Sequence, residues 1–199
     1  MTEQLASAQW KAQRIKELLG DVPPHATIID VGCGDGLLTA CLASLFFEHT
    51  VIGVDTDMAV IAHAQRMHAD VQFHAINQLN DITAYTPTIL IASLMLHHVP
   101  RAEQQTTVHE LMSLLPIGGM LIILEYNPYC PSVQLTRLTD VHERNATFIS
   151  CNTLYQWLQT DSASVTHEYY LHVPTWLAWC ERVVPQQLAR VYGVKFRKK

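Results

Sequence analysis

The sequence lacks several features that would assign it to a class of protein at once. Its apolar runs fall well short of the roughly 18 residues that a membrane-spanning helix needs, and residues 1–20 lack the basic-then-apolar order of a signal peptide. No internal repeat, low-complexity tract or linker rich in proline, glycine or serine divides the 199 residues. We therefore expect one cytoplasmic domain without a membrane partner.

Cysteine and histidine occur without the spacings that form common disulfide or metal sites. The five cysteines are odd in number and include no C-x-x-C pair, so neither a disulfide framework nor a structural zinc site is expected. The 11 histidines include no H-x-x-x-H or H-E-x-x-H pattern, which would place two imidazoles on one helical face. We interpret the cysteines as reduced thiols and predict no metal site.

Basic residues are too few to suggest a polyanion as the partner. The chain has 13 Lys and Arg against 18 Asp and Glu, a formal net charge of −5, so nucleic acid would need a local basic patch. The one dense basic run is terminal and consists of Lys195, Arg197, Lys198 and Lys199. We interpret this run as a solvated end of the chain and expect no nucleic-acid partner.

Short apolar runs alternate with stretches of helical spacing through most of the chain. The runs at 27–31, 51–54, 71–75, 88–93 and 120–125 predict strands, and the stretches at 5–19, 37–47, 57–68, 101–115 and 152–159 predict helices. A strand at 165–172, a Trp-rich helix at 175–184 and a last strand through Phe196 follow. Near-continuous apolar strands are typical of a parallel sheet covered on both faces, so we predict an α/β, doubly wound fold.

A glycine-rich turn stands where the first predicted strand ends and a helix begins. It reads Asp30-Val31-Gly32-Cys33-Gly34-Asp35-Gly36, and its glycines allow a tight turn and close approach of a ligand to the backbone. Free N–H groups at the start of the helix favour an anionic or carboxylate group. The spacing G-x-G-x-G differs from the dinucleotide fingerprint G-x-G-x-x-G, and no Gly-Lys-Ser/Thr follows as in a P-loop.

An acidic residue at the end of the second strand indicates the kind of ligand. Asp55 lies 19 residues beyond Gly36, where a carboxylate can accept hydrogen bonds from both hydroxyls of a ribose. Together with the glycine turn, it predicts a ligand that contains a nucleoside.

These motifs resemble those of the class I S-adenosylmethionine-dependent methyltransferases. Ile91–Val99 is similar to the stretch that follows strand four in that family, and Leu115–Gly119 is similar to its Gly-Gly turn before strand five. The resemblance implies a Rossmann-like, mostly parallel seven-stranded sheet with an antiparallel last strand, S-adenosyl-L-methionine as the methyl donor and S-adenosyl-L-homocysteine as the product. The residues that it places at the donor are Asp30, Gly32, Cys33, Gly34, Gly36, Asp55, Thr56, Met58, Asn77, Gln78 and Ser93.

The sequence departs from the family at two places. The family has an acid after strand three that reaches the adenine amino group, whereas this chain has Asn77 and Gln78 there, so one of these residues or Asp81 must substitute. The aspartate that commonly starts strand four is replaced by the segment 85–88. Met58 is expected to pack on the adenine.

The segment after the fifth predicted strand, Glu125–Pro131, has the pattern E-x-N-P-x-x-P. It resembles a stretch in a group of small bacterial methyltransferases. The Asn-Pro-Pro-Tyr motif of DNA-methylating enzymes is a poorer match, because that motif follows strand four and holds a flipped base.

Methyl transfer from a sulfonium needs positioning and exclusion of water more than covalent chemistry from the protein. A hydroxyl or protonated amine acceptor would still need a base, and a histidine with its ordinary pKa is the usual candidate. We expect His98, His97 and Tyr126 as catalytic candidates, although packing or hydrogen-bonded roles for both histidines are equally compatible with the pattern. The candidates for contact with the acceptor are Trp10, His98, Glu125, Asn127 and Arg137, and we interpret Trp176 and Trp179 as core.

The sequence thus predicts a methyltransferase that acts on a small molecule, most simply by O- or N-methylation. One alternative is that the acceptor is RNA or protein. The other is that the chain is a non-catalytic donor-binding module that partners another enzyme. We expect residues 1–199 to form one domain, with residues 1–22 as a capping helix, 26–125 as the donor-binding core and 126–199 on the substrate side. The motifs identify neither the acceptor nor the oligomeric state.

Overall fold

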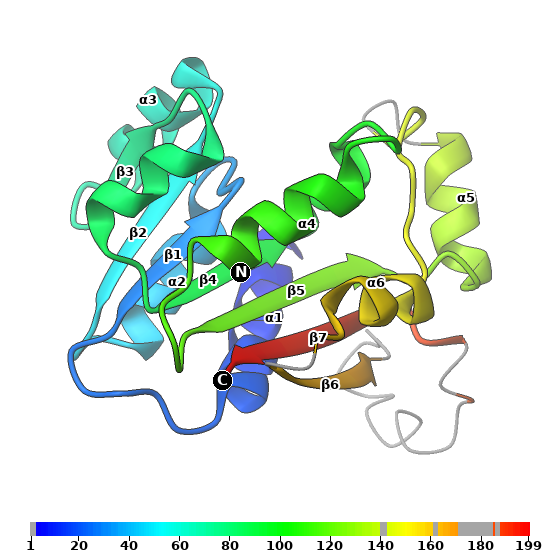
Figure 1. Ribbon diagram of the computed structural model, residues 1–199. Helices are drawn as coiled ribbons and strands as arrows, with labels where there is room; N and C mark the ends of the chain where they lie inside the picture. Colours follow the sequence, from blue (N-terminus) through cyan, green and yellow to red (C-terminus); the bar gives the residue numbers. More distant parts are fainter. Residues whose placement is uncertain (1–2, 140–142, 161–162, 171–184, 186–187) are drawn as a thin grey trace.

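A computed structural model describes residues 3–139, 143–160, 163–170, 185 and 188–199 (Figure 1). The helices are α1 Glu3–Leu19, α2 Leu37–Leu45, α3 Met58–Met67, α4 Gln104–Ser113, α5 Pro131–Thr139 and α6 Cys151–Leu158, with 3-10 helices η1 Leu79–Tyr85 and η2 Leu96–His98. The strands are β1 Thr27–Val31, β2 Thr50–Asp55, β3 Gln72–Ala75, β4 Ile89–Ser93, β5 Met120–Tyr126, β6 Ala163–Tyr170 and β7 Val191–Lys198. Within the described residues, no helix is both long and apolar enough to cross a membrane.

All seven strands form one sheet, in the order β3-β2-β1-β4-β5-β7-β6. The five strands from β3 to β5 run parallel, and β7 pairs antiparallel with both β5 and β6. This confirms the predicted mostly parallel, seven-stranded sheet with an antiparallel last strand. The chain reverses its strand order between β1 and β4, and ligands of such sheets bind outside the carboxyl ends of the strands at that point.

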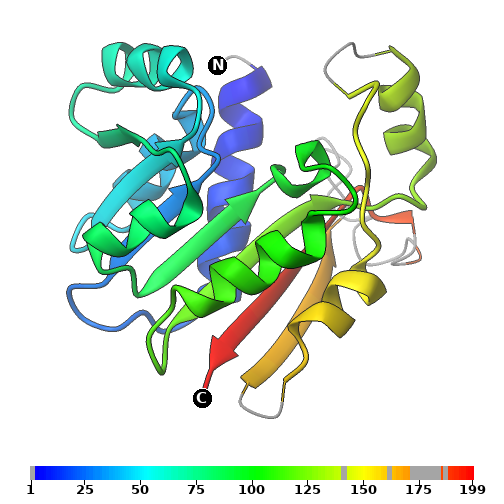
Figure 2. The same ribbon diagram turned by 45° about the horizontal axis from the view of Figure 1, so that its top comes forward.

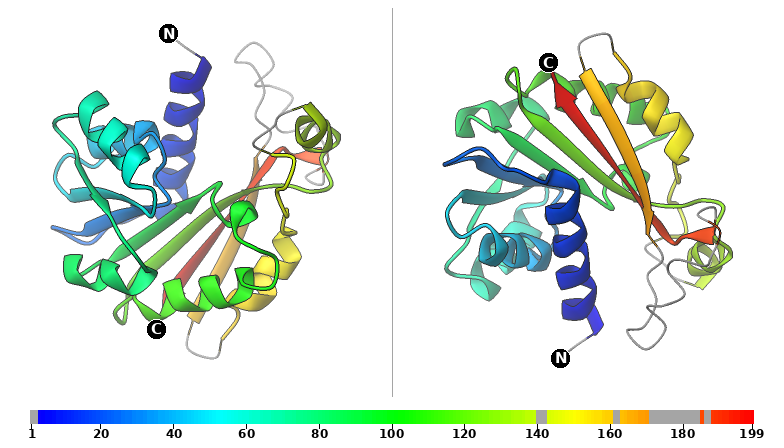
Figure 3. Two further views of the ribbon diagram at one scale, coloured as in Figure 1. Left: turned by 90° about the horizontal axis from the view of Figure 1, so that it is seen from above. Right: turned by 90° about the horizontal axis from the view of Figure 1, so that it is seen from below.

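Alternate residues of the central strands belong to two separate cores. On one face, Ile28, Ile89 and Ile122 pack with the buried side chains of α1 and α2. On the other face, Ile29, Leu90 and the neighbouring apolar residues of β5 pack with α4 and α6. The two helix layers are visible on opposite sides of the sheet (Figures 2 and 3). The period of two in a sheet explains why the strands read as continuous apolar runs in the sequence.

Most of the predicted elements are present, with ends shifted by up to three residues. Asp57 accepts hydrogen bonds from the N–H groups of Ala59 and Val60 and so caps α3, as its position predicts. Sequence periodicity did not predict α5 or η1, because both are short and largely polar. The predicted helix at 175–184 lies outside the described residues.

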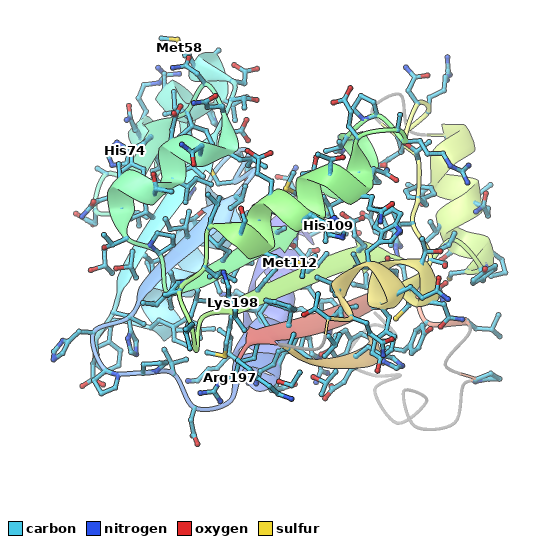
Figure 4. All side chains as sticks on the ribbon, in the orientation of Figure 1. Met58, His74, His109, Met112, Arg197 and Lys198 are labelled. Carbon is cyan, nitrogen blue, oxygen red and sulfur yellow. The ribbon has the colours of Figure 1, made fainter. Side chains whose placement is uncertain are left out.

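The terminal basic run lies in β7 except for Lys199, which follows it. Arg197 and Lys199 are exposed, as a solvated end predicts, whereas that interpretation is wrong for Lys195 and Lys198. Lys195 Nζ donates to the carbonyl of Leu19 at the end of α1, at 2.8 Å. Lys198 Nζ donates to the carbonyl of Leu115, at 2.7 Å, just beyond α4 (Figure 4). Each lysine satisfies a carbonyl at the negative end of a helix, and together they join β7 to both helix layers.

Replacing Lys198 with Met should lower the free energy of unfolding by about 1 kcal/mol, because a carbonyl at the end of α4 loses a charged donor. Arg197→Met is the matched control, since Arg197 is an exposed neighbour on the same strand. Urea denaturation of both variants measures the difference. Equal midpoints for the two variants would show that the Lys198 contact contributes nothing.

Candidate functional site

The glycine turn after β1 is held against the end of β2 by two backbone hydrogen bonds. The N–H groups of Gly32 and Cys33 both donate to the carbonyl of Val54, at 2.8 and 3.0 Å. Gly34 and Gly36 have positive φ angles of 56° and 79°. A Cβ at Gly36 would lie 2.6 Å from the Phe73 ring, whereas a Cβ at Gly34 would meet nothing within 4 Å. Gly36 therefore serves packing, and Gly34 faces open space.

Two cavities lie beside this turn. The first, of about 380 Å³, is lined by α1 and the turn, and includes Lys11, Asp30, Cys33, Asp35 and Ser93. The second, of about 660 Å³, lies at the carboxyl ends of the strands and includes Gly34, Asp55, Thr56, Ile76, Leu79 and His98. Gly32 lines both, so the turn separates a polar cavity from a larger, more apolar one.

Asp55 is fixed at the end of β2 by two backbone donors. Its Oδ2 accepts from the N–H of Gly34 at 3.1 Å, and its Oδ1 accepts from the N–H of Asp57 at 3.0 Å. Each carboxylate oxygen can accept a second hydrogen bond. The side chain is thus oriented at the wall of the second cavity with acceptor capacity left for a ligand.

Asp30 is a buried carboxyl, 1% exposed, at the first cavity. The hydroxyl of Thr39 donates to its Oδ2 at 2.7 Å. Burial raises its pKa to about 6, while the Thr39 hydrogen bond and the charge of Lys11 oppose that rise. Burial likewise lowers the pKa of Lys11, which Asp30 and Asp35 partly offset. A buried acid and a half-buried base therefore line the same small cavity.

Ser93 completes this cavity from the end of β4. Its Oγ is buried, and the described residues offer it no hydrogen-bond partner. Buried hydroxyls without a partner are uncommon in native proteins. This hydroxyl lines the cavity that also holds Asp30 and Lys11, so a polar ligand there would satisfy it.

Four of the residues expected at the ligand are absent from the lining of both cavities. Met58, labelled in Figure 4, begins α3, is 76% exposed and lines neither cavity. Asn77 and Gln78 are exposed, and their N–H groups donate to the carboxylate of Asp81 in the first turn of η1. Trp10 packs edge-on against Tyr170, with ring centroids 5.8 Å apart. Ile76 and Leu79 take the apolar position in the second cavity instead.

The ends of β4 and β5 meet through a buried carboxylate. Glu125 is fully buried and accepts from the N–H of Leu96 at 2.8 Å and from His97 Nδ1 at 2.6 Å. On the other side of the same ring, His97 Nε2 lies 3.4 Å from Glu143 Oε2. Burial lowers the pKa of His97, but the hydrogen bond and charges of Glu125 and Glu143 outweigh it, so the pKa of His97 is raised.

The remaining candidates have distinct surroundings. His98 is exposed and lines the second cavity, whereas the described lining of either cavity includes neither His97 nor Tyr126. Tyr126 lies beside the His97 ring, 5.4 Å between centroids, and burial raises its pKa. Asn127 is 1% exposed and donates to the carbonyl of Ala189 at 2.8 Å, which gives it a structural role. Arg137 lies in α5, and its side chain is outside the described part of the structure.

Gln104 joins the segment after β4 to the segment that carries Glu143. It is 2% exposed, and its amide donates to the carbonyls of Leu96 and Thr147, at 3.0 and 2.7 Å. The N–H of Thr147 in turn donates to the carbonyl of His97 at 2.8 Å. These bonds hold Glu143 near His97 although the two residues are far apart in the sequence.

Three site residues were not predicted from the sequence. Lys11 lies beside Ala8, Ala12 and Ile15 on the buried stripe of α1, and a lysine on an apolar stripe is a signal that could have found it. Gln104 likewise stands four residues before Val108 on the buried side of α4. Glu143 has no comparable signal, because it lies outside any periodic element.

A family described as a methyltransferase domain matches residues 28–119. A trans-aconitate 2-methyltransferase of Variovorax paradoxus is 34% identical over 115 residues, which cover 54% of this chain and 42% of the relative. A ubiquinone biosynthesis O-methyltransferase of Xanthomonas campestris pv. campestris is 31% identical over 108 residues, which cover 52% and 44%. The matched part of this chain spans less than half the length of either curated relative.

Among solved structures, a SAM-dependent methyltransferase from Archaeoglobus fulgidus is similar along most of its length. The TM-score is 0.69 at 14% sequence identity, and the match covers 96% of this chain and 94% of that one. At this identity, the similarity establishes a shared fold.

The two glycines of the turn should differ in their effect on stability. Alanine at either position adopts a left-handed backbone conformation, which costs about 1–2 kcal/mol. Gly36→Ala also overlaps the Phe73 ring, so it should cost about 1–3 kcal/mol more than Gly34→Ala. Urea denaturation compares the two variants directly. Equal destabilisation would contradict the packing role of Gly36.

Proposed function

Because the chain belongs to the class I S-adenosylmethionine-dependent methyltransferases, we propose that it transfers a methyl group from S-adenosylmethionine to a small-molecule acceptor. The observation that carries the proposal is that the glycine turn and Asp55 meet at the wall of one cavity, at the point where the strand order reverses. The product of the donor would be S-adenosylhomocysteine.

The polar first cavity fits the amino acid end of the donor. That end is a zwitterion, and the cavity offers Lys11 for its carboxylate and Asp30 for its ammonium group. The buried Ser93 hydroxyl would gain a partner from the same group. A pair of opposite charges placed in this way suits a zwitterion better than a simple anion.

The second cavity fits the nucleoside end. Asp55 can accept from the ribose hydroxyls while it keeps its two backbone donors. Thr56 is its neighbour on the cavity wall, and Ile76 and Leu79 offer an apolar surface for the adenine. Gly34 presents backbone without a side chain to the space between the two ends.

Two observations support a small acceptor. Lys195 and Lys198 are bonded to helix ends, so only part of the terminal basic run remains for a polyanion. The two curated relatives bear names that denote small-molecule methyltransferases. We place the acceptor beside His98, an exposed residue of η2 that lines the second cavity. We infer that oxygen or nitrogen receives the methyl group.

We further propose that different parts of the chain bind the donor and the acceptor. Residues of α1 line the first cavity, so the segment 1–22 would cover the donor, whereas 26–125 carries the turn, Asp55 and His98. The part from 126 to 199 would then shape the acceptor side, as one domain with the rest.

Asp55→Ala should weaken binding of S-adenosylhomocysteine at least about tenfold, because a hydrogen bond to a charged group contributes about 1.5–3 kcal/mol. Calorimetry measures the affinity. Asp70→Ala is the control, since Asp70 is exposed in the loop before β3. Absence of binding by the unmodified chain at millimolar ligand, or equal affinity of the Asp55 variant, would overturn the assignment of the donor site.

Donor affinity should depend on pH through Asp30. The carboxyl keeps its proton up to about pH 6, and an ammonium group favours the ionised form, so binding should release a proton below that pH. The charged groups that act on Asp30 are Lys11, Asp35 and Asp55.

The affinity for S-adenosylhomocysteine should therefore fall as the pH drops below about 6 and level off above it. Asp30→Asn should bind more weakly above pH 6 and lose this dependence. Calorimetry between pH 5 and about 8 tests both statements. If the affinity of the Asp30→Asn variant depended on pH as that of the unmodified chain does, Asp30 would not belong to the donor site.

A further inference from the structure

Two buried polar atoms face one another near His98, at the edge of the second cavity. His97 Nε2 and Glu143 Oε2 lie 3.4 Å apart, and the described residues provide neither atom with a hydrogen bond. The side chain of His97 is 1% exposed and that of Glu143 is 13% exposed. Leaving such groups unsatisfied costs about 1–3 kcal/mol each. Either a proton on Nε2, which makes the two side chains an ion pair, or a third group that contacts both atoms would satisfy them.

Glu125 determines which ring nitrogen of His97 has a lone pair that can bind a further group. It holds Nδ1 at 2.6 Å, and its other oxygen is fixed by the N–H of Leu96. An ionised carboxylate only accepts, so the hydrogen belongs on Nδ1 and the lone pair of the neutral ring lies on Nε2. A carboxylate that orients an imidazole from behind is the usual partner of a metal-binding histidine.

His98 adds a third ligand atom. The candidate ligand atoms of His97, His98 and Glu143 all lie within 4.8 Å of one another. Two ligands at zinc distances of about 2.0–2.2 Å, in tetrahedral geometry, are separated by about 3.3–3.6 Å. The observed 3.4 Å between His97 Nε2 and Glu143 Oε2 falls in that range.

We propose that His97 Nε2, His98 and Glu143 bind one divalent transition-metal ion, with zinc as the best chemical match. Two imidazoles and one carboxylate suit zinc, cobalt or nickel, whereas calcium and magnesium prefer oxygen ligands throughout. Glu125 is then a positioning residue. Three protein ligands leave a fourth position open, which is typical of a reactive site.

The position of His98 indicates what occupies the fourth site. His98 lines the second cavity, so the ion lies at the edge of that space. Resting on the proposed function, we assign the open position to an oxygen of the methyl acceptor. His98 then holds the ion that contacts the acceptor and does not act as a free base.

Titration of chelator-treated protein with Zn²⁺, and with Co²⁺ followed by its visible absorption, tests the site without any donor or acceptor. The full chain should bind one ion. His98→Ala and Glu143→Gln should each weaken binding at least about tenfold, because each removes a ligand. Both side chains are at least partly accessible, so these variants should fold.

His63→Ala is the matched control, because His63 is an exposed histidine on α3, which packs at the opposite edge of the sheet. It should bind Zn²⁺ as the unmodified chain does. Lack of stoichiometric binding, or loss of affinity in the His63 variant equal to that in the His98 variant, would overturn the metal site. Zinc binding by a chain that does not bind S-adenosylhomocysteine would sustain the site and refute the proposed function.

Acetohydroxamate, a small oxygen chelator, tests the open position separately. It should change the visible spectrum of the Co²⁺-loaded chain, because it adds oxygen ligands to the ion. An unchanged spectrum would show that the coordination is closed, and the assignment of the acceptor to the ion would fall.

Discussion

The buried carboxylate of Glu125 is the interaction on which the site depends. It stands at the end of β5, where it accepts one hydrogen bond from the backbone after β4 and one from His97. Removing a carboxylate from water is costly unless its hydrogen bonds are met, so these two donors must keep their places. The direction of the chain after β4, and with it the position of His98 at the cavity, follows from that requirement.

A second buried carboxyl imposes a similar constraint at the end of β1. Asp30 lies under α1, where Thr39 and Lys11 offset its burial. Because Lys11 comes from α1, the polar cavity exists only when α1 is docked on the sheet. Lys195 on β7 bonds to the last residue of α1 and supports that docking from the far end of the chain. The polar cavity, which we propose as part of the donor site, is thus assembled from segments that are remote in sequence.

The sequence predicted what depends on local pattern and missed what depends on distant contacts. The apolar strands, the glycine turn, the Asp57 cap and Asp55 follow from spacing alone, and the structure has each where it was expected. Met58 is exposed on the first turn of α3 and is absent from the lining of both cavities, so its contact with the adenine stays a prediction. Gln104 and Glu143 meet His97 only through tertiary contacts, so no motif contains them.

The same reasoning explains why no metal site was expected from the sequence. Spacing rules find ligands that share a helix or a short loop, whereas Glu143 reaches the two histidines from a segment some 45 residues away. Charge gives an independent argument for an ion. Two carboxylates, Glu125 and Glu143, flank one imidazole, and a neutral imidazole leaves two negative charges buried at this edge. A divalent cation balances them, and a proton on His97 balances only one.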